Sequence, residues 1–149
     1  MAVEQAAEAL FVDTNVLVYA NVAEAPQHAA ALAAISRARE AGRTLWISRQ
    51  VLREYLATLT RPQAFASVPR ATVLEQARWF AEHFEMANDT AAVAEQLLRL
   101  MATVPVGGKQ VHDANIVATM IAYRIPALLT HNELDFKQFA RWVRVQSIA

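Results

Sequence analysis

The sequence contains no cysteine, so disulfide bonds and thiolate zinc sites are excluded, and a cytoplasmic location is the default expectation. No apolar run reaches the roughly 18 residues that a membrane-spanning helix needs. Residues 1–9 are acidic and rich in alanine, and they lack the basic start and long apolar stretch of a signal peptide. We therefore expect neither a membrane anchor nor a cleaved leader.

An excess of charge is also missing, because 14 basic residues balance 14 acidic ones. Nucleic-acid-binding domains are usually basic, so this balance is no indication of such a function, but it leaves room for an enzyme that contacts a few phosphates. The chain has 149 residues, of which 55% are hydrophobic and 19% charged, without internal repeats or low-complexity linkers. These values predict one globular domain over residues 1–149, with residues 1–9 as an N-terminal extension.

Short apolar strands alternate with helices along the chain. The strands show no alternation of apolar and polar residues, which is typical of strands buried on both faces of a parallel sheet. The predicted fold is therefore α/β, a three-layer α/β/α sandwich around a parallel sheet of about five strands. Strands are expected at residues 10–12, 45–47, 84–86, 127–130 and 143–145. Helices are expected at residues 15–20, 26–41, 49–59, 69–83, 90–101, 111–123 and 136–142, the last one short.

Four carboxylates follow the ends of these strands or loops. Asp13 ends the first strand, and Glu54 lies in the helix after the second. Asp113 lies in the first turn of the helix at 111–123, and Asp135 follows the fourth strand in a polar loop at 131–135. Ligands of parallel sheets bind outside the carboxyl ends of the strands. Acids gathered there suit one or two Mg²⁺ ions, which activate water and neutralise phosphate.

Each acid also has a simpler structural interpretation. Asp13 could serve as a helix N-cap, and Glu54 could be a solvated helix residue beside a buried stripe. Asp113 would be favoured by the helix dipole alone, and Asp135 could cap the short helix that follows it. The grouping of all four at one rim is what favours a functional site.

Other polar residues near the acids carry less information. His112 and His131 adjoin them, but a lone histidine is more often a hydrogen-bonding or surface residue. Arg49, Arg53 and Lys109 could contact phosphates, although a solvated face is the default for each.

The chain resembles the PIN domain family, and most closely the VapC-like toxin ribonucleases, over about residues 10–145. Four segments carry the resemblance, and their order and strand context make it specific. They are Phe11-Val12-Asp13-Thr14-Asn15-Val16-Leu17, Gln50-Val51-Leu52-Arg53-Glu54-Tyr55, His112-Asp113-Ala114-Asn115-Ile116-Val117-Ala118, and Leu129-Thr130-His131-Asn132 with Asp135-Phe136.

The resemblance implies a three-layer fold, a ribonuclease dependent on Mg²⁺ or Mn²⁺, a cognate antitoxin and a homodimer. Asp13, Glu54 and Asp113 take the places of the family's acidic metal site, with Thr14 or Asn15 ordering it. The family often has an acid two residues after the last strand's threonine, where this chain has Asn132. Either Asp135 or the amide oxygen of Asn132 would then complete the metal site.

The leading hypothesis is a metal-dependent endoribonuclease that hydrolyses RNA phosphodiester bonds, as the toxin of a toxin–antitoxin pair. One alternative is a catalytically silent PIN-like module that binds RNA or protein. Another is a Mg²⁺-dependent phosphohydrolase on a different doubly wound fold, although a HAD-type phosphatase would need an acid where Asn15 stands. Trp46, Trp79 and Trp142 are large for a small core, so we also expect exposed apolar surface and self-association.

Overall fold

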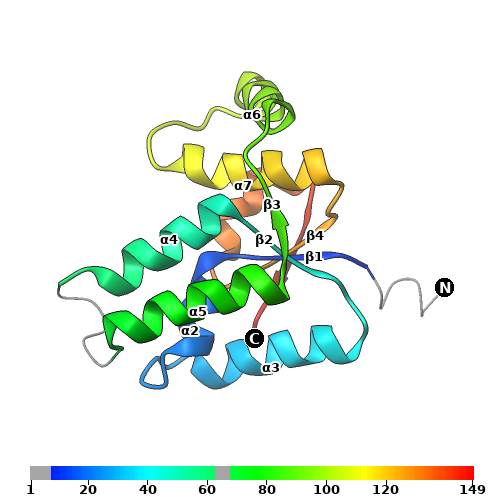
Figure 1. The fold of residues 1–149 in the computed structure, drawn as a ribbon. Helices are drawn as coiled ribbons and strands as arrows, with labels where there is room; N and C mark the ends of the chain where they lie inside the picture. The colour runs from blue at the N-terminus through cyan, green and yellow to red at the C-terminus, as the bar shows by residue number, and fades with distance from the viewer. Residues whose placement is uncertain (1–7, 63–67) are drawn as a thin grey trace.

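The computed structural model describes residues 8–62 and 68–149, and it shows a five-stranded sheet at the centre of the molecule (Figure 1). All pairs are parallel, in the order β3-β2-β1-β4-β5. The predicted parallel sheet is therefore confirmed. The expected N-terminal extension lies outside the described residues, apart from its last two positions. The strands are β1 (Leu10–Val12), β2 (Leu45–Ser48), β3 (Glu85–Ala87), β4 (Ala127–Thr130) and β5 (Arg144–Ser147).

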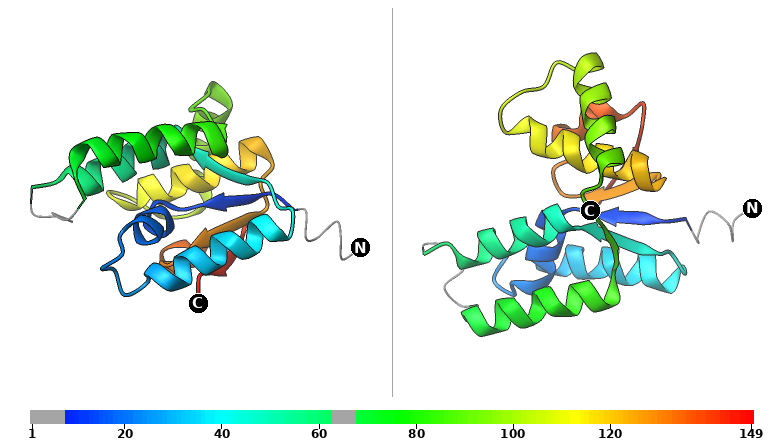
Figure 2. Two further views of the ribbon diagram at one scale, coloured as in Figure 1. Left: turned by 60° about the horizontal axis from the view of Figure 1, so that its bottom comes forward. Right: turned by 45° about the horizontal axis from the view of Figure 1, so that its top comes forward.

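Helices cover both faces of the sheet and make the three layers (Figure 2). On one face α6 packs against α7; on the other α2 packs against α3, and α4 against α5 and α2. The helices are α2 (Thr14–Asn21), α3 (His28–Glu40), α4 (Arg49–Thr60), α5 (Arg70–His83), α6 (Ala91–Thr103) and α7 (Gln110–Tyr123), with the 3₁₀ helix η1 (Glu133–Phe139). Among the described residues, no helix is both long and apolar enough to cross a membrane.

Hydroxyl side chains cap the N-termini of two of the helices. Ser48 accepts a hydrogen bond of 3.2 Å from the backbone N of Val51 and so caps α4. Thr90 accepts one of 3.3 Å from the backbone N of Val93 and so caps α6. The Ser48 cap begins α4 directly after β2, and this sets the position of Glu54 relative to the end of that strand.

The segment after β4 differs from the prediction of a loop followed by a helix at 136–142. It is instead a 3₁₀ helix that begins at Glu133 and ends at Phe139. Phe136 and Phe139 are both 1% exposed, and a 3₁₀ helix places residues three apart on the same face. Burial of this pair therefore favours a helix that begins before residue 136, and Asp135 lies within it.

The sheet centre is fully apolar and aligns the ends of its strands. Every residue of β1 and β4 is buried, and Val12 pairs with Leu129. The next residues, Asp13 and Thr130, therefore emerge side by side at the carboxyl edge. This register sets the position of the site.

Candidate active site

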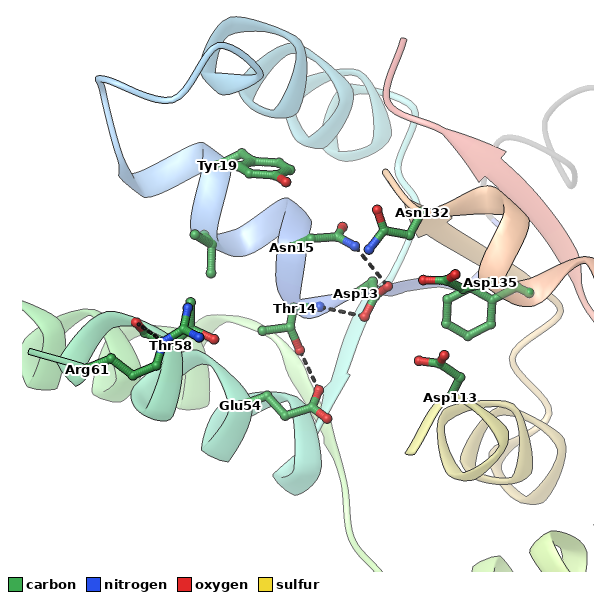
Figure 3. Close-up of a pocket in the computed structure, with 12 residues that line it drawn as sticks. Asp13, Thr14, Asn15, Tyr19, Glu54, Thr58, Arg61, Asp113, Asn132 and Asp135 are labelled. Carbon is green, nitrogen blue, oxygen red and sulfur yellow. Dashed lines mark hydrogen bonds between the residues drawn. The ribbon is translucent and has the colours of Figure 1, made fainter. Parts of the chain in front are cut away.

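One cavity of about 430 Å³ lies at the carboxyl ends of the central strands (Figure 3). It brings together all the acids predicted from the sequence, although they lie on four different elements of the chain. Their placement at one rim is as expected. The lining residues are Asp13, Thr14, Asn15, Val18, Tyr19, Glu54, Thr58, Arg61, Asp113, Asn132, Asp135 and Phe136.

Asp13 is held by three donors at the end of β1. Its Oδ2 accepts 2.8 Å from the hydroxyl of Thr130 and 3.3 Å from the amide of Asn15. Its Oδ1 accepts 2.8 Å from the backbone N of Thr14, so Asp13 also caps α2. The structural interpretation of Asp13 as a helix N-cap is therefore confirmed, and its place in a functional site stays a prediction.

Asn15 and Thr130 order the loop that follows β4. The Oδ1 atom of Asn15 accepts 3.1 Å from the backbone N of His131, and its amide lies 3.3 Å from the Thr130 hydroxyl. That hydroxyl also accepts 3.0 Å from the backbone N of Asn132. The sequence pattern assigns Thr130 no role, and its one local signal is a hydroxyl that follows the apolar residues 127–129 of a buried strand.

Glu54 occupies the α4 side of the cavity and uses both oxygens. Its Oε1 accepts 2.8 Å from the hydroxyl of Thr14, and its Oε2 accepts 3.2 Å from the amide of Gln50. The side chain of Thr14 thus holds the Glu54 carboxylate, and that of Asn15 holds the Asp13 carboxylate.

Asp113 points into the cavity from the first turn of α7, where it is half-buried. Burial raises its pKa to about 6, and the nearby charges of Asp13, Asp135 and Glu54 add to the rise, while His112 opposes it. No hydrogen bond among the described residues involves its carboxylate. The Asp135 carboxylate likewise has no hydrogen bond among the described residues, so Asp113 and Asp135 are both free to bind a cation.

The pKa of Asp13 is also raised to about 6, chiefly by burial. Its hydrogen bonds from Thr130 and Thr14 lower the pKa, and the charges of Glu54 and Asp135 raise it. The charges of Glu54 and Asp135 therefore act on both Asp13 and Asp113 across one cavity.

The donor set matches the oxygen ligands that Mg²⁺ and Mn²⁺ prefer. Within residues 8–62 and 68–149, however, no three acidic or histidine side chains are grouped tightly enough to bind one ion directly. Mg²⁺ commonly keeps several waters and touches only one or two carboxylates, so an acid-lined cavity fits such an ion.

Asn132 and Asp135 both line the cavity, so both remain candidates for the last ligand position. Asp135 does not cap the following helix, because it lies within η1 and Asn132 occupies the N-cap position. The Asn132 side chain makes no capping hydrogen bond.

Arg61 is a cavity residue that the sequence did not reveal. It ends α4, and its Nε lies 3.4 Å from the backbone O of Thr58, another lining residue. Arg53 instead pairs with Asp89 at 3.3 Å, and Arg49 donates 3.0 Å to an asparagine on the β3–α6 loop. Among the lining residues in the described part of the chain, Arg61 is the one basic side chain.

A parallel three-layer sheet with acids at its carboxyl edge is typical of a family of α/β domains. Members of this family are typically metal-dependent nucleases. Residues 10–141 match the PIN domain, and the chain belongs to that family.

Solved structures of toxins share the fold. A toxin–antitoxin complex from Klebsiella pneumoniae is 22% identical, covers 95% of this chain and 98% of its own, and has a TM-score of 0.65. VapC20 of Mycobacterium tuberculosis, a sarcin–ricin loop cleaving toxin, is 18% identical over 89% of this chain and 95% of its own, with a TM-score of 0.66. VapBC2 of Rickettsia felis, bound to a promoter DNA fragment, is 18% identical. It covers 93% of this chain and 98% of its own, with a TM-score of 0.66. No curated protein is significantly similar by sequence.

Proposed function

We propose that the protein is an endoribonuclease dependent on Mg²⁺ or Mn²⁺ that hydrolyses RNA phosphodiester bonds. The observation that carries the proposal is the convergence of Asp13, Glu54, Asp113 and Asp135 on one cavity at the sheet edge. When bound, the ion supplies an activated water and neutralises the phosphate. Membership of the PIN family and the likeness to toxin structures support this proposal.

In this proposal the acids bind the ion, and their hydrogen-bond partners hold the acids in position. Asp13, Glu54 and Asp113 hold the ion directly or through water, with Asp135 or the amide oxygen of Asn132 completing the set. One of the carboxylates accepts the proton that the attacking water loses. The hydroxyls and amides around them keep the carboxylates in place.

Arg61 gives the substrate a cation at the edge of an otherwise acidic cavity. Phosphate contacts position RNA without reading its sequence, and a single arginine suffices for one such contact. A chain with no net charge can therefore bind RNA locally.

Cleavage of a mixed RNA substrate in EDTA, Mg²⁺ and Mn²⁺ tests the proposal. We expect cleavage with either metal and none in EDTA, and we expect the Asp113→Asn variant to be inactive in both metals. Metal-dependent cleavage by that variant at the wild-type rate would contradict the assignment of the activity to this cavity. Binding of RNA without cleavage under all conditions would support a silent binding module instead.

We further propose that the protein is the toxin of a pair, because the similar structures include toxin–antitoxin complexes. An apolar groove of about 280 Å³ between α3 and α5 would receive the antitoxin. Trp79 and Leu32 line it and are 46% and 44% exposed, whereas Trp46 and Trp142 are only partly exposed.

Arg39 lies over the Trp79 ring at 5.7 Å and gives this groove a positive edge. The fitting partner is an apolar segment of the antitoxin that carries an acidic residue. Co-purification with a co-expressed small protein encoded next to the gene tests this pairing, and Trp79→Ala should abolish it. Sedimentation of the chain alone tests the homodimer; a strict monomer at micromolar concentration would contradict it.

A further inference from the structure

A buried glutamine connects the two sides of the acidic cavity. Gln50 is 5% exposed and lies one helical turn before Glu54 on α4. Its amide N donates 2.8 Å to the backbone O of His112, the residue directly before Asp113 on α7. The same N donates 3.2 Å to Oε2 of Glu54.

Asn115 fixes the orientation of this glutamine. Its amide donates 2.8 Å to Oε1 of Gln50. Both N–H groups of Gln50 then face acceptors, the His112 carbonyl and the Glu54 carboxylate. A reversed amide would direct its oxygen at both acceptors, so the buried side chain has one favourable arrangement.

The bridge joins helices that otherwise pack in different layers. Helix α4 packs against α5 and α2, whereas α7 packs against α6 on the other face of the sheet. Glu54 and Asp113 carry like charges, which favour separation of the two helices at this edge. The Gln50 hydrogen bonds oppose that separation.

We infer that Gln50, oriented by Asn115, is a positioning residue that sets the spacing between the Glu54 and Asp113 carboxylates. This inference rests on the proposed metal-dependent function. Residues that orient metal ligands commonly change metal affinity or activity by 10- to 100-fold, on the order of magnitude, when they are replaced.

The test uses Gln50→Met, which keeps the side-chain length and removes all three hydrogen bonds. Gln96→Met on α6 is the control, because it makes the same change on the far layer. Mn²⁺ binding is measured by calorimetry without RNA, and kcat and KM are measured separately with RNA. We expect Gln50→Met to lose about 10- to 100-fold in Mn²⁺ affinity and in kcat, with KM within about threefold. The control should match the wild type.

Asn115→Ala provides a second variant, because this half-buried residue can be truncated with less risk to folding. It should lower Mn²⁺ affinity in the same direction but less, about three- to tenfold. The double variant should be no worse than Gln50→Met alone, because both act through one bridge.

The outcomes separate this inference from the proposed function. If the wild type binds Mn²⁺ and cleaves RNA, but folded Gln50→Met and Asn115→Ala match it in both measurements, the positioning role is wrong. A lower melting temperature with unchanged Mn²⁺ affinity would show a purely structural role and also overturn it. If the wild type neither binds Mn²⁺ nor cleaves, the proposed function itself fails.

Discussion

The two halves of the acidic cavity are built differently. On the β1 side, Asp13 is 7% exposed and accepts hydrogen bonds from Thr14, Asn15 and Thr130. On the α7 side, Asp113 is half-buried and receives no hydrogen bond from the described residues. The pKa of both carboxyls is about 6, and burial is the main cause for both, but only Asp13 has hydrogen bonds that oppose the shift.

This difference separates two tasks within one site. Asp13 is part of the fold, because it caps α2 and fixes the end of β4, so its removal disturbs structure and chemistry together. The Asp113 carboxylate holds no other described residue by a hydrogen bond. Its charge lowers the stability of the folded protein unless a cation binds, because the carboxylate is half-buried and near other acids. Substitutions on the two sides should therefore give different combinations of activity and stability.

The largest expected effect is on cleavage by Asp113→Asn. This change removes a charge while nearly keeping the shape, so RNA cleavage should fall by two or more orders of magnitude, roughly 3 kcal/mol of barrier. RNA affinity should change little, since acids do not bind phosphate. The rate and RNA binding are measured side by side in Mg²⁺ and Mn²⁺.

Asp135→Asn is the matched comparison on η1. It should cost less than Asp113→Asn, because Asn132 also lines the cavity and offers an amide oxygen. An equal or larger loss would assign the last ligand position to Asp135 alone. Wild-type cleavage by Asp113→Asn would contradict the nuclease assignment.

The next effect is stabilisation by metal. A cation that binds only the folded state raises its stability by about 2.7 kcal/mol when present at roughly 100 times its Kd. Melting temperature should therefore rise in millimolar Mn²⁺ for the wild type and not for Asp113→Asn. An unchanged melting temperature for the wild type would contradict a metal site in this cavity.

The sequence predicts the sheet and the shared rim of the four acids for a physical reason. Strands buried on both faces have a continuous apolar pattern, and the residue after such a strand must lie at the carboxyl edge, as Asp13 does. Gln50, Thr130 and Arg61 could not be found this way. Their roles depend on tertiary register: Gln50 meets Asn115 across 65 positions, and Thr130 meets Asp13 across 117.

Helix boundaries were less predictable than helix existence. The sequence pattern predicts a loop at Asp135, because nothing local distinguishes a polar loop from a 3₁₀ turn. The segment forms a 3₁₀ helix because Phe136 and Phe139 are buried. Their burial depends on the surrounding core and cannot be predicted from the segment alone.

A smaller effect concerns pH in the absence of metal. The folded pKa of Asp13 and of Asp113 is about 6, above the ordinary value of 3.8. The native state therefore binds more protons at these two carboxyls than the unfolded state between these values. Their contribution to stability is fully present below about pH 4 and is lost as pH rises through 6. Denaturant midpoints in EDTA at several pH values measure this fall.

Asp113→Asn should remove part of that pH dependence, on the order of 1 kcal/mol, because its side chain is partly solvated. Asp13→Asn should reduce the pH dependence too. It should also lower stability, because its amide N would face the Thr130 and Asn15 donors that now point at Oδ2 of Asp13. Identical pH profiles for the wild type and Asp113→Asn would contradict the raised pKa of Asp113.

The smallest expected effect distinguishes Arg61 from Arg53. Arg61 lines the cavity, whereas Arg53 is paired with Asp89 at 3.3 Å on the outer surface. Arg61→Ala should raise KM for RNA about three- to tenfold with kcat within about twofold, because it removes one phosphate contact but no acid. The slope of log affinity against log salt should fall by about 0.7, the value for one contact with a single strand. Arg53→Ala is the matched control and should change neither quantity.

Binding is measured in the Asp113→Asn background, so that RNA remains intact. If the two alanine variants lose affinity equally, RNA crosses the outer face of α4 as well, and the cation at the cavity is not the one that positions the substrate.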